Sequence, residues 1–414
     1  MAEKREKEFA RVSECEGGVL AAEGFRAAAV AAAIKYEGRD DVMLLVADEP
    51  CAAAAVFTTN KVAAAPVLYD RSIANKGRLQ AILANSGCAN ACTGEGGCRD
   101  AALSAIQTAE ALGVKPEHVM VASTGVIGRR LPMERLLGGM RAAAAALQRS
   151  PEVALAAARA IMTTDTRPKQ AAARIQIGGK TVTVGGMTKG SGMIEPNMAT
   201  MLGFITTDAA ITPQCLKRAL KLAVARSFNR VVVDGDESTN DSLFLMASGK
   251  AGNAVISRAG ADFDAFLAAL TSVAVSLARQ MAADGEGATK FVTVTVRGAK
   301  SERDAERAAR AIAKSPLAKT SWFGKDPNWG RVLAAAGYSG AEVDGDAAEV
   351  FYGGEWAYSK GKVADEQQLA RLAKALEANE LDVLVDLHLG EAQASIYTCD
   401  FSLDYVHINA DYTT

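Results

Sequence analysis

The sequence has almost no excess of charge of either sign. Lys and Arg number 46 against 48 Asp and Glu, so the formal net charge is −2, and the two signs are mixed along the chain. Proteins that bind nucleic acid or an anionic membrane through charge carry clusters of basic residues. We therefore expect neither nucleic acid nor a membrane as a partner of this chain.

A hydrophobic leader and a long uninterrupted apolar run are also lacking. Residues 1–8 carry charges of both signs and lack the apolar segment of a secretory signal. The longest apolar helical stretch, residues 266–278, contains Thr271, Ser272 and Ser276. It is shorter than the roughly 18 residues that a membrane-spanning helix needs. We expect a soluble, cytoplasmic protein in which this stretch is a buried helix.

Cysteine is scarce and its number is odd. Seven cysteines in a long chain without a leader do not indicate a disulfide framework. Cys88, Cys92 and Cys98 form a C-x3-C-x5-C cluster, but no fourth ligand lies nearby and the spacing is typical of neither zinc nor iron–sulfur sites. We predict reduced, packed thiols and no metal. A non-catalytic metal-binding or ligand-binding protein built on this cluster remains a rival hypothesis, which metal analysis would test.

The length and the hydrophobic content predict more than one domain. At 414 residues the chain is too long for one simple core, and 49% of its residues are hydrophobic. Alanine supplies much of that fraction, which favours closely packed helices. Helix and strand signals alternate, so we predict a layered α/β fold. The pattern of helix and strand signals changes near residue 290. We therefore predict a main domain at 1–290 and a C-terminal α/β domain at 291–414.

Capping residues and apolar periodicity predict the individual elements. Ser150-Pro151-Glu152 and Thr212-Pro213 each place a capping hydroxyl before a proline, which is typical of a helix start. The expected helices are 100–112, 131–147, 151–162, 213–225, 262–283 and 302–314. The expected strands are 42–47, 54–58, 80–83, 175–177, 181–184, 202–206, 230–233, 243–247, 291–296 and segments near 350, 383 and 396. A glycine-rich loop is expected near Trp329.

The most informative stretch is residues 189–204. A glycine-rich polar loop runs into Thr200, and a strand-like apolar run follows at once. Threonine is a poor nucleophile unless a base takes its proton, and a free α-amine on the same residue has a pKa of about 7.7–8.0. We therefore hypothesise cleavage between Ala199 and Thr200, which leaves fragments 1–199 and 200–414. On chemistry alone, such a loop is more often only a loop.

Further motifs follow one another along nearly the whole chain. They lie at 24–28, 56–61, 84–87, 89–94, 123–128, 162–166, 189–204, 227–230, 233–236, 285–290, 326–331 and 408–414. In this order they resemble the ornithine acetyltransferase family, the bifunctional glutamate N-acetyltransferases of arginine biosynthesis. One departure is Cys88, where the family has asparagine, and it puts no catalytic role in doubt.

The resemblance implies a fold and a reaction. The fold would be an α–β–β–α sandwich with a smaller C-terminal domain. The precursor would cut itself between Ala199 and Thr200, and Thr200 would carry an acetyl group from N-acetylornithine to glutamate. No cofactor is implied, and whether acetyl-CoA is a second donor stays open. The family also implies that two copies of each fragment associate.

The resemblance also assigns the site residues. An oxyanion hole would lie at Thr124 and Gly125. Substrate contacts would be made by Thr163, Lys189, Thr200, Glu286, Asn409 and Thr414. Such roles are chemically reasonable, because a hydroxyl and a glycine amide can donate to an oxyanion and a lysine can bind the α-carboxylate that both substrates carry. From the residues alone, 123–125 is a turn, Lys189 lies in a loop, and Thr163 is not separable from Thr164.

A hydrolase is the alternative function. An aminopeptidase or amidase of related architecture uses the same N-terminal nucleophile and passes the acyl group to water. Added glutamate separates the two activities, because transfer yields acetylglutamate and hydrolysis yields acetate.

Overall fold

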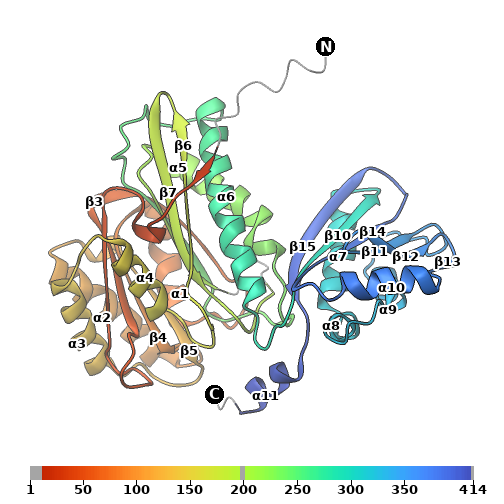
Figure 1. The fold of residues 1–414 in the computed structure, drawn as a ribbon. Helices are drawn as coiled ribbons and strands as arrows, with labels where there is room; N and C mark the ends of the chain where they lie inside the picture. Colours follow the sequence, from red (N-terminus) through yellow and green to blue (C-terminus); the bar gives the residue numbers. More distant parts are fainter. Residues whose placement is uncertain (1–11, 196–200, 412–414) are drawn as a thin grey trace.

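The structure, a computed structural model, describes residues 12–195 and 201–411, and its strands form two sheets (Figure 1). The first sheet runs in the order β1-β6-β7-β8-β9-β3-β4-β5, and β2 also pairs with β3. Its strands are β1 (Ser13–Glu14), β2 (Phe25–Val30), β3 (Val42–Phe57), β4 (Arg78–Cys88), β5 (Val119–Val126), β6 (Lys169–Ile177), β7 (Lys180–Lys189), β8 (Leu202–Thr207) and β9 (Ser242–Ala247).

The long strand β3 joins two halves of the first sheet. Its first part pairs with β2 and β4, its second part pairs with β9, and its register against β4 shifts between Val46 and Cys51. The two halves pack on each other through alternate residues, because side chains of a strand point to opposite faces. Met43 belongs to the same buried cluster as Phe204 and Phe244, whose rings stack with centroids 5.5 Å apart.

Helices cover both outer faces of this double layer. These helices are α1 (Ala65–Ile73), α2 (Gly94–Leu112), α3 (Met133–Ala145), α5 (Pro213–Arg226) and α6 (Ala261–Ala283). A further helix, α4 (Pro151–Ala160), packs its buried alanines into the cluster that contains Met43, Phe204 and Phe244. Leu44 of β3 packs with α2 and α3, whereas Leu245 of β9 packs with α5 and α6. The expected α–β–β–α sandwich is therefore confirmed.

Helix α6 is a core helix of this sandwich. By length and composition alone, it is the one helix of the described residues that could cross a membrane. Phe266, Leu270, Val273 and Leu277 follow helical spacing and are buried in the cluster that contains β6 and β7. These apolar side chains lie on one side of α6 and pack against the sheet, as expected for a buried helix of a globular domain.

The second sheet forms a separate layer beside the first. Its order is β13-β12-β11-β14-β10-β15, and its core includes the buried side chains of Trp322 and Tyr352. Its strands are β10 (Phe291–Ala299), β11 (Glu349–Tyr352), β12 (Glu355–Ser359), β13 (Lys362–Val363), β14 (Glu380–Asp386) and β15 (Ala392–Cys399). Its helices are α7 (Glu302–Lys314), α8 (Pro316–Phe323), α9 (Trp329–Gly337) and α10 (Glu366–Ala375). The predicted boundary at 290 falls beside the start of β10, and the division into domains 1–290 and 291–414 stays a prediction.

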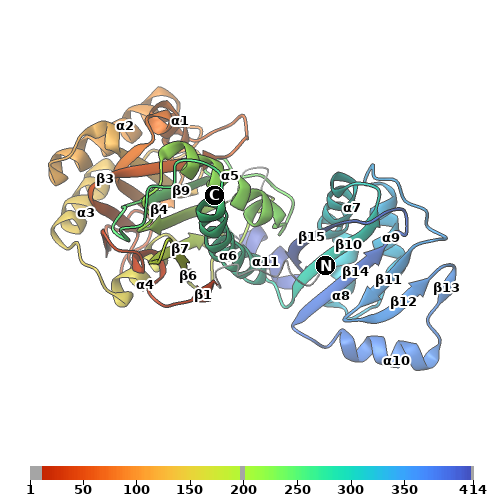
Figure 2. The same cartoon turned by 90° about the horizontal axis from the view of Figure 1, so that it is seen from above.

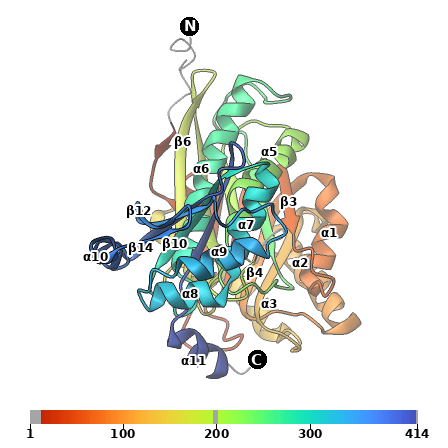
Figure 3. The ribbon, with the colours of Figure 1, turned by 90° about the vertical axis from the view of Figure 1, so that its right-hand side faces the viewer.

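The last helix leaves the second sheet and returns toward the first. Helix α11 (Leu403–Asp411) lies below the two sheets in Figures 1 and 3 and between them in Figure 2. The backbone N–H of Thr289 and that of Lys290 both donate to Asp400, which fixes the chain just before this helix. The C-terminal segment therefore reaches the main body.

The structure differs from several of the expected elements. Residues 42–47 and 54–57 are strand as expected, but they belong to one continuous strand, β3, because β9 continues the pairing that β2 begins. Residues 230–233 form no strand of a sheet; Val231 makes a single bridge to Tyr397 after a 3₁₀ turn. Trp329 begins a helix instead of lying in a loop, because the Asn328 side chain accepts from the N–H of Arg331.

Candidate active site

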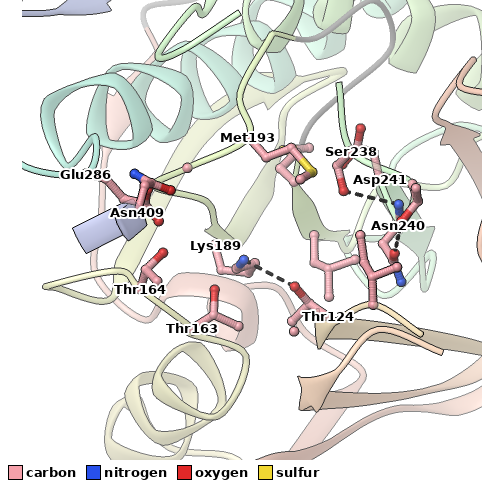
Figure 4. A pocket seen from close by; sticks show the side chains of 16 residues that line it. Thr124, Thr163, Thr164, Lys189, Met193, Ser238, Asn240, Asp241, Glu286 and Asn409 are labelled. Carbon is pink, nitrogen blue, oxygen red and sulfur yellow. Dashed lines mark hydrogen bonds between the residues drawn. The ribbon is translucent and has the colours of Figure 1, made fainter. Parts of the chain in front are cut away.

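A pocket opens where the ends of β5, β7 and β8 come together (Figure 4). It encloses about 180 Å³ and contains six of the predicted site residues in its lining. These are Thr124, Gly125, Thr163, Lys189, Glu286 and Asn409. The remaining predicted residues, Ala199, Thr200 and Thr414, lie outside the described residues.

Strand pairing brings Lys189 to this pocket. Lys189 is the last residue of β7 and pairs with Leu202 of β8, which in turn pairs with Ser242 of β9. The prediction that Lys189 lies in a loop was wrong, because pairing with β8 carries the strand through to this residue. Because Lys189 is the last residue of β7, its side chain lies at the end of the sheet that lines the pocket.

Thr124 and Gly125 also lie in a strand instead of the expected turn. The parallel pairing of β4 with β5 continues through Gly87 and Gly125, both of which have positive φ angles, 98° and 130°. A Cβ at Gly125 would lie 2.4 Å from the carbonyl carbon of Gly87. Only glycine allows the two strands to approach this closely.

Lys189 and Thr124 make a direct contact. The Lys189 Nζ donates to Thr124 Oγ1 over 3.2 Å (Figure 4). The Thr124 hydroxyl accepts this bond, so its own proton is available to an acceptor in the pocket. Asn240 supports this arrangement, because its side-chain amide donates to the carbonyl of Ser123 over 2.8 Å.

A buried charge network lies beside Lys189. Burial lowers the pKa of Lys189, and the carboxylate of Asp165 opposes that shift. Asp165 accepts from Lys169 Nζ over 2.6 Å and from the N–H of Gly190 over 2.7 Å, while Lys169 also pairs with Asp284. Burial by itself would raise the pKa of Asp165, but Lys189 and Lys169 hold it down at about 2. Asp165 is thus ionised and compensates the two buried lysines.

Glu286 and Asn409 form a second polar pair, on the opposite side of the pocket from Asn240 and Asp241 (Figure 4). Asn409 of α11 donates from Nδ2 to Glu286 Oε2 over 2.9 Å. The N–H of Glu286 donates to the carbonyl of Ser191 over 2.9 Å, which joins the loop after α6 to the loop after β7. The site therefore combines residues from both parts of the chain.

Thr163 and Thr164 both line the pocket after the end of α4. The N–H of Thr163 donates to Asp165 Oδ2 over 3.0 Å, which ties this loop to the charge network. The structure brings both threonines to the pocket, and the choice between them stays open.

Sequence reasoning missed several pocket residues in the segment before β9. Ser238, Thr239, Asn240 and Asp241 all line the pocket. Asp241 is 2% exposed, and burial raises its pKa well above the usual range of an aspartate. In the sequence, Asp241 is visible only as an acid directly before a buried strand. Its place in the pocket follows from the pairing of β9 with β8, which the sequence does not show.

The cysteine cluster is spread between the interior and the surface. Cys88 is buried, whereas Cys92 and Cys98 are exposed, so the prediction of packed thiols was wrong for these two; all seven thiols are free. Within residues 12–195 and 201–411, the one group of at least three close ligand-type side chains is Glu349, Asp386 and His388. His388 contacts Glu349 over 2.6 Å, and Asp386 pairs with Arg297.

The sequence model of the ArgJ family matches residues 26–414. The chain belongs to the ArgJ family. The arginine biosynthesis bifunctional protein ArgJ of Symbiobacterium thermophilum is 54% identical over 401 residues, which cover 96% of this chain and 99% of that protein. The ArgJ of Geobacter sulfurreducens, of the same name, is 51% identical over 391 residues, covering 94% and 99%.

Some solved structures are also similar to this chain. The ornithine acetyltransferase of Mycobacterium tuberculosis, solved in complex with ornithine, is 43% identical, covering 46% of this chain and 100% of that chain at a TM-score of 0.43. The resemblance that the motifs indicated is confirmed by the family match and by the curated relatives. The rival hypothesis of a non-catalytic protein built on the cysteines is not supported by these relatives.

Proposed function

We propose that this ArgJ family member is an acyltransferase that moves the acetyl group of N-acetylornithine to glutamate in arginine biosynthesis. The observation that carries the proposal is the convergence of the Lys189–Thr124 pair and the Glu286–Asn409 pair on one pocket. Both substrates are amino acids with an α-carboxylate and an amine, and the pocket offers a cation and a carboxylate to bind them. Membership of the ArgJ family supports the same reaction.

In the first half-reaction, the Thr200 hydroxyl attacks the acetyl carbonyl. Its α-amine takes the hydroxyl proton, the bond between the acetyl carbon and the substrate nitrogen breaks, and the proton leaves with the ornithine amine. The second half-reaction reverses these steps with the amine of glutamate, which yields acetylglutamate and restores the hydroxyl. Thr124 Oγ1 and the N–H of Gly125 donate to the oxyanion in both halves. Lys189 binds the α-carboxylate and Glu286 a substrate amine, with Thr163, Asn409 and Thr414 as further contacts.

The nucleophile is made by cleavage between Ala199 and Thr200. The expected products are fragments 1–199 and 200–414, which stay together and associate as two copies of each in the cytoplasm. Intact mass and light scattering of purified protein test the cleavage and the assembly. An uncut chain with full activity contradicts the nucleophile.

The decisive experiment is incubation with N-acetylornithine followed by peptide mass analysis. We expect an acetyl adduct on the peptide that begins at Thr200, and no adduct in Thr200→Ala. Acetate production that glutamate does not divert to acetylglutamate would favour the hydrolase.

A second donor is part of the proposal. The relatives are called bifunctional, and we assign acetyl-CoA as a co-substrate that acetylates the same threonine; no other cofactor is needed. The assay is acetylglutamate formation from acetyl-CoA and glutamate without acetylornithine. No product under these conditions would restrict the enzyme to acetyl recycling.

A further inference from the structure

Lys169 is a buried lysine that the proposed reaction does not use. It is the first residue of β6, and 0% of its side chain is exposed. Its ammonium group donates to Asp165 Oδ1 over 2.6 Å, to Asp284 Oδ2, and to the carbonyl of Arg167 over 3.4 Å. A cation out of water is costly unless it is paired, and both of its carboxylate partners are themselves buried. The further contacts of the two carboxylates therefore show what this lysine holds together.

Asp165 joins two segments that reach the pocket. Its Oδ2 accepts from the N–H of Thr163 over 3.0 Å, and its Oδ1 accepts from the N–H of Gly190 over 2.7 Å. Thr163 lines the pocket, and Gly190 directly follows Lys189, which also lines it (Figure 4). One carboxylate thus fixes the backbone at or beside two of the predicted substrate contacts.

Asp284 adds the third segment. The N–H of Thr166 donates to Asp284 Oδ2 over 3.1 Å, which ties the end of α6 to the loop after α4. The Asp284 carbonyl accepts from the Ser191 hydroxyl over 2.6 Å, and the Ser191 carbonyl accepts from the N–H of Glu286 over 2.9 Å. Glu286 is the third predicted substrate contact of this network and lines the pocket.

The three segments differ in how their backbone is held. Lys169 pairs with Thr188 of β7, one residue before Lys189, so its ammonium group stands on a strand that is fixed against the pocket strand. Residues 163–166 and 284–286 lie in loops after α4 and α6. Loops depend on the scaffold that they contact for a defined position. Here the hydrogen bonds that lead back to Lys169 connect both loops to the sheet.

We propose that Lys169 is a positioning residue for the substrate side of the pocket. By joining Asp165 to Asp284, its ammonium group fixes the three segments relative to one another. The contacts on these segments hold substrate groups such as the α-carboxylate, which do not change as the acetyl group moves. Correct spacing should therefore contribute mainly to binding, and less to the rate of the bound complex. This inference rests on the proposed function.

Compensation of buried charge is the competing explanation. Lys169 would then only neutralise an aspartate, and any change that keeps the net charge of the group would serve as well. Lys169→Met removes the ammonium group and leaves one carboxylate uncompensated. Lys169→Met combined with Asp284→Asn removes one charge of each sign, so the net charge stays that of the unmodified protein. Both variants break the link, so their comparison separates the link from the charge.

The test measures KM, kcat and direct binding. We expect Lys169→Met to raise KM for N-acetylornithine and for glutamate about 10-fold, with kcat within about threefold. The Kd of ornithine, measured by calorimetry, should rise by a similar factor without any turnover. The double variant should show the same rise in KM and Kd, although its unfolding free energy recovers relative to Lys169→Met, since no unpaired carboxylate remains buried.

Lys290→Met is the matched control. Lys290 is also a buried lysine, and its ammonium group donates to the carbonyls of Leu376 and Ala378 over 2.7 and 3.0 Å, just after α10. The substitution keeps the backbone N–H that donates to Asp400. It should lower the unfolding free energy and leave KM and the Kd of ornithine unchanged.

Two outcomes overturn the inference. Unchanged KM and Kd in a folded Lys169→Met protein remove the positioning role. Recovery of both constants in the double variant reduces Lys169 to charge compensation, and this variant decides the question if Lys169→Met alone does not fold. If the unmodified protein binds ornithine but transfers no acetyl group, the proposed function fails while the comparison of Kd values still tests Lys169, so the two failures are distinguishable.

Discussion

At the scale of single residues, the Lys189–Thr124 hydrogen bond is consistent with two different proposed roles: Thr124 donates to the oxyanion, and Lys189 binds the substrate α-carboxylate. Because the Thr124 hydroxyl accepts from Lys189, its proton points to another acceptor, and the proposed oxyanion is that acceptor. Lys189 in turn is held between Asp165 and the pocket. Replacing the uncharged Thr124 therefore tests transition-state stabilisation without changing the charge of the site.

Thr124→Ala should lower kcat and leave the fold intact. One oxyanion donor is worth about 10²- to 10³-fold in rate, or about 3–4 kcal/mol, and KM should change little because the donor acts in the transition state. Steady-state acetyl transfer measures both constants. Thr124→Ser, which keeps the hydroxyl, should retain most of the rate. Unchanged turnover in the alanine variant would remove Thr124 from the oxyanion hole.

Asp165 should contribute stability that is lost in acid. Its folded pKa is about 2, below the value of about 3.9 in an unfolded chain, so the contribution is complete above pH 4 and disappears as the pH falls toward 2. The shift corresponds to about 2–3 kcal/mol of unfolding free energy at neutral pH. Urea unfolding of Asp165→Asn should show a deficit of this order at pH 7 that shrinks in acid. A pH-independent deficit contradicts the assigned ionisation.

The sequence predicted the site residues that stand within recognisable motifs. Thr124, Lys189 and Glu286 were assigned through the family motifs in which they stand, and all three line the pocket. Asp241 was not found, because its place depends on which strand pairs with β8. Spacing along the chain carries no information about that pairing.

At the scale of elements, helices with a polar cap were predicted most accurately. Ser150, Thr212 and Ser301 each accept from a backbone N–H at the start of α4, α5 and α7, so the local sequence determines where these helices begin. Strand ends were less predictable. Lys189 was assigned to a loop because glycines follow it, although pairing with β8 extends β7 to that residue.

Gly287 controls the position of α11. It has φ +68°, and a Cβ there would lie 2.4 Å from the N atom of Tyr405. Gly287→Ala should push α11 away and weaken the contact of Asn409 with Glu286, which raises KM for the amino-acid substrates. Kinetics with acetylornithine and glutamate measure the effect.

Gly138→Ala is the control for this substitution. Gly138 lies inside α3, where an added Cβ meets nothing within 4 Å. It should leave KM unchanged and leave the unfolding free energy equal or slightly higher, because alanine is a better helix former than glycine. If Gly287→Ala behaves like this control, α11 does not hold the substrate side of the pocket.

At the scale of the whole molecule, the proposed cleavage falls between two strands of the first sheet, and not in the connection between the two sheets. Strands β8 and β9 would belong to fragment 200–414, and they lie between β7 and β3 of fragment 1–199. Each side of this two-strand insert makes six backbone pairs with its neighbour. The buried cluster around Phe204 and Phe244 also contains side chains from both fragments.

The cut protein should therefore behave as one folded body. Separation of the fragments would break two strand pairings, expose the edges of β7, β8, β9 and β3, and open a shared hydrophobic core, so it should require unfolding. We expect both fragments to elute together in size-exclusion chromatography under native conditions and to separate only in denaturant above the unfolding midpoint. A Thr200→Ala chain, which stays uncut, is the control and should elute at the same native position. Separation of the fragments in native buffer would mean that the strands flanking the cut are not paired in the mature enzyme, and the pocket between β5, β7 and β8 would not survive processing.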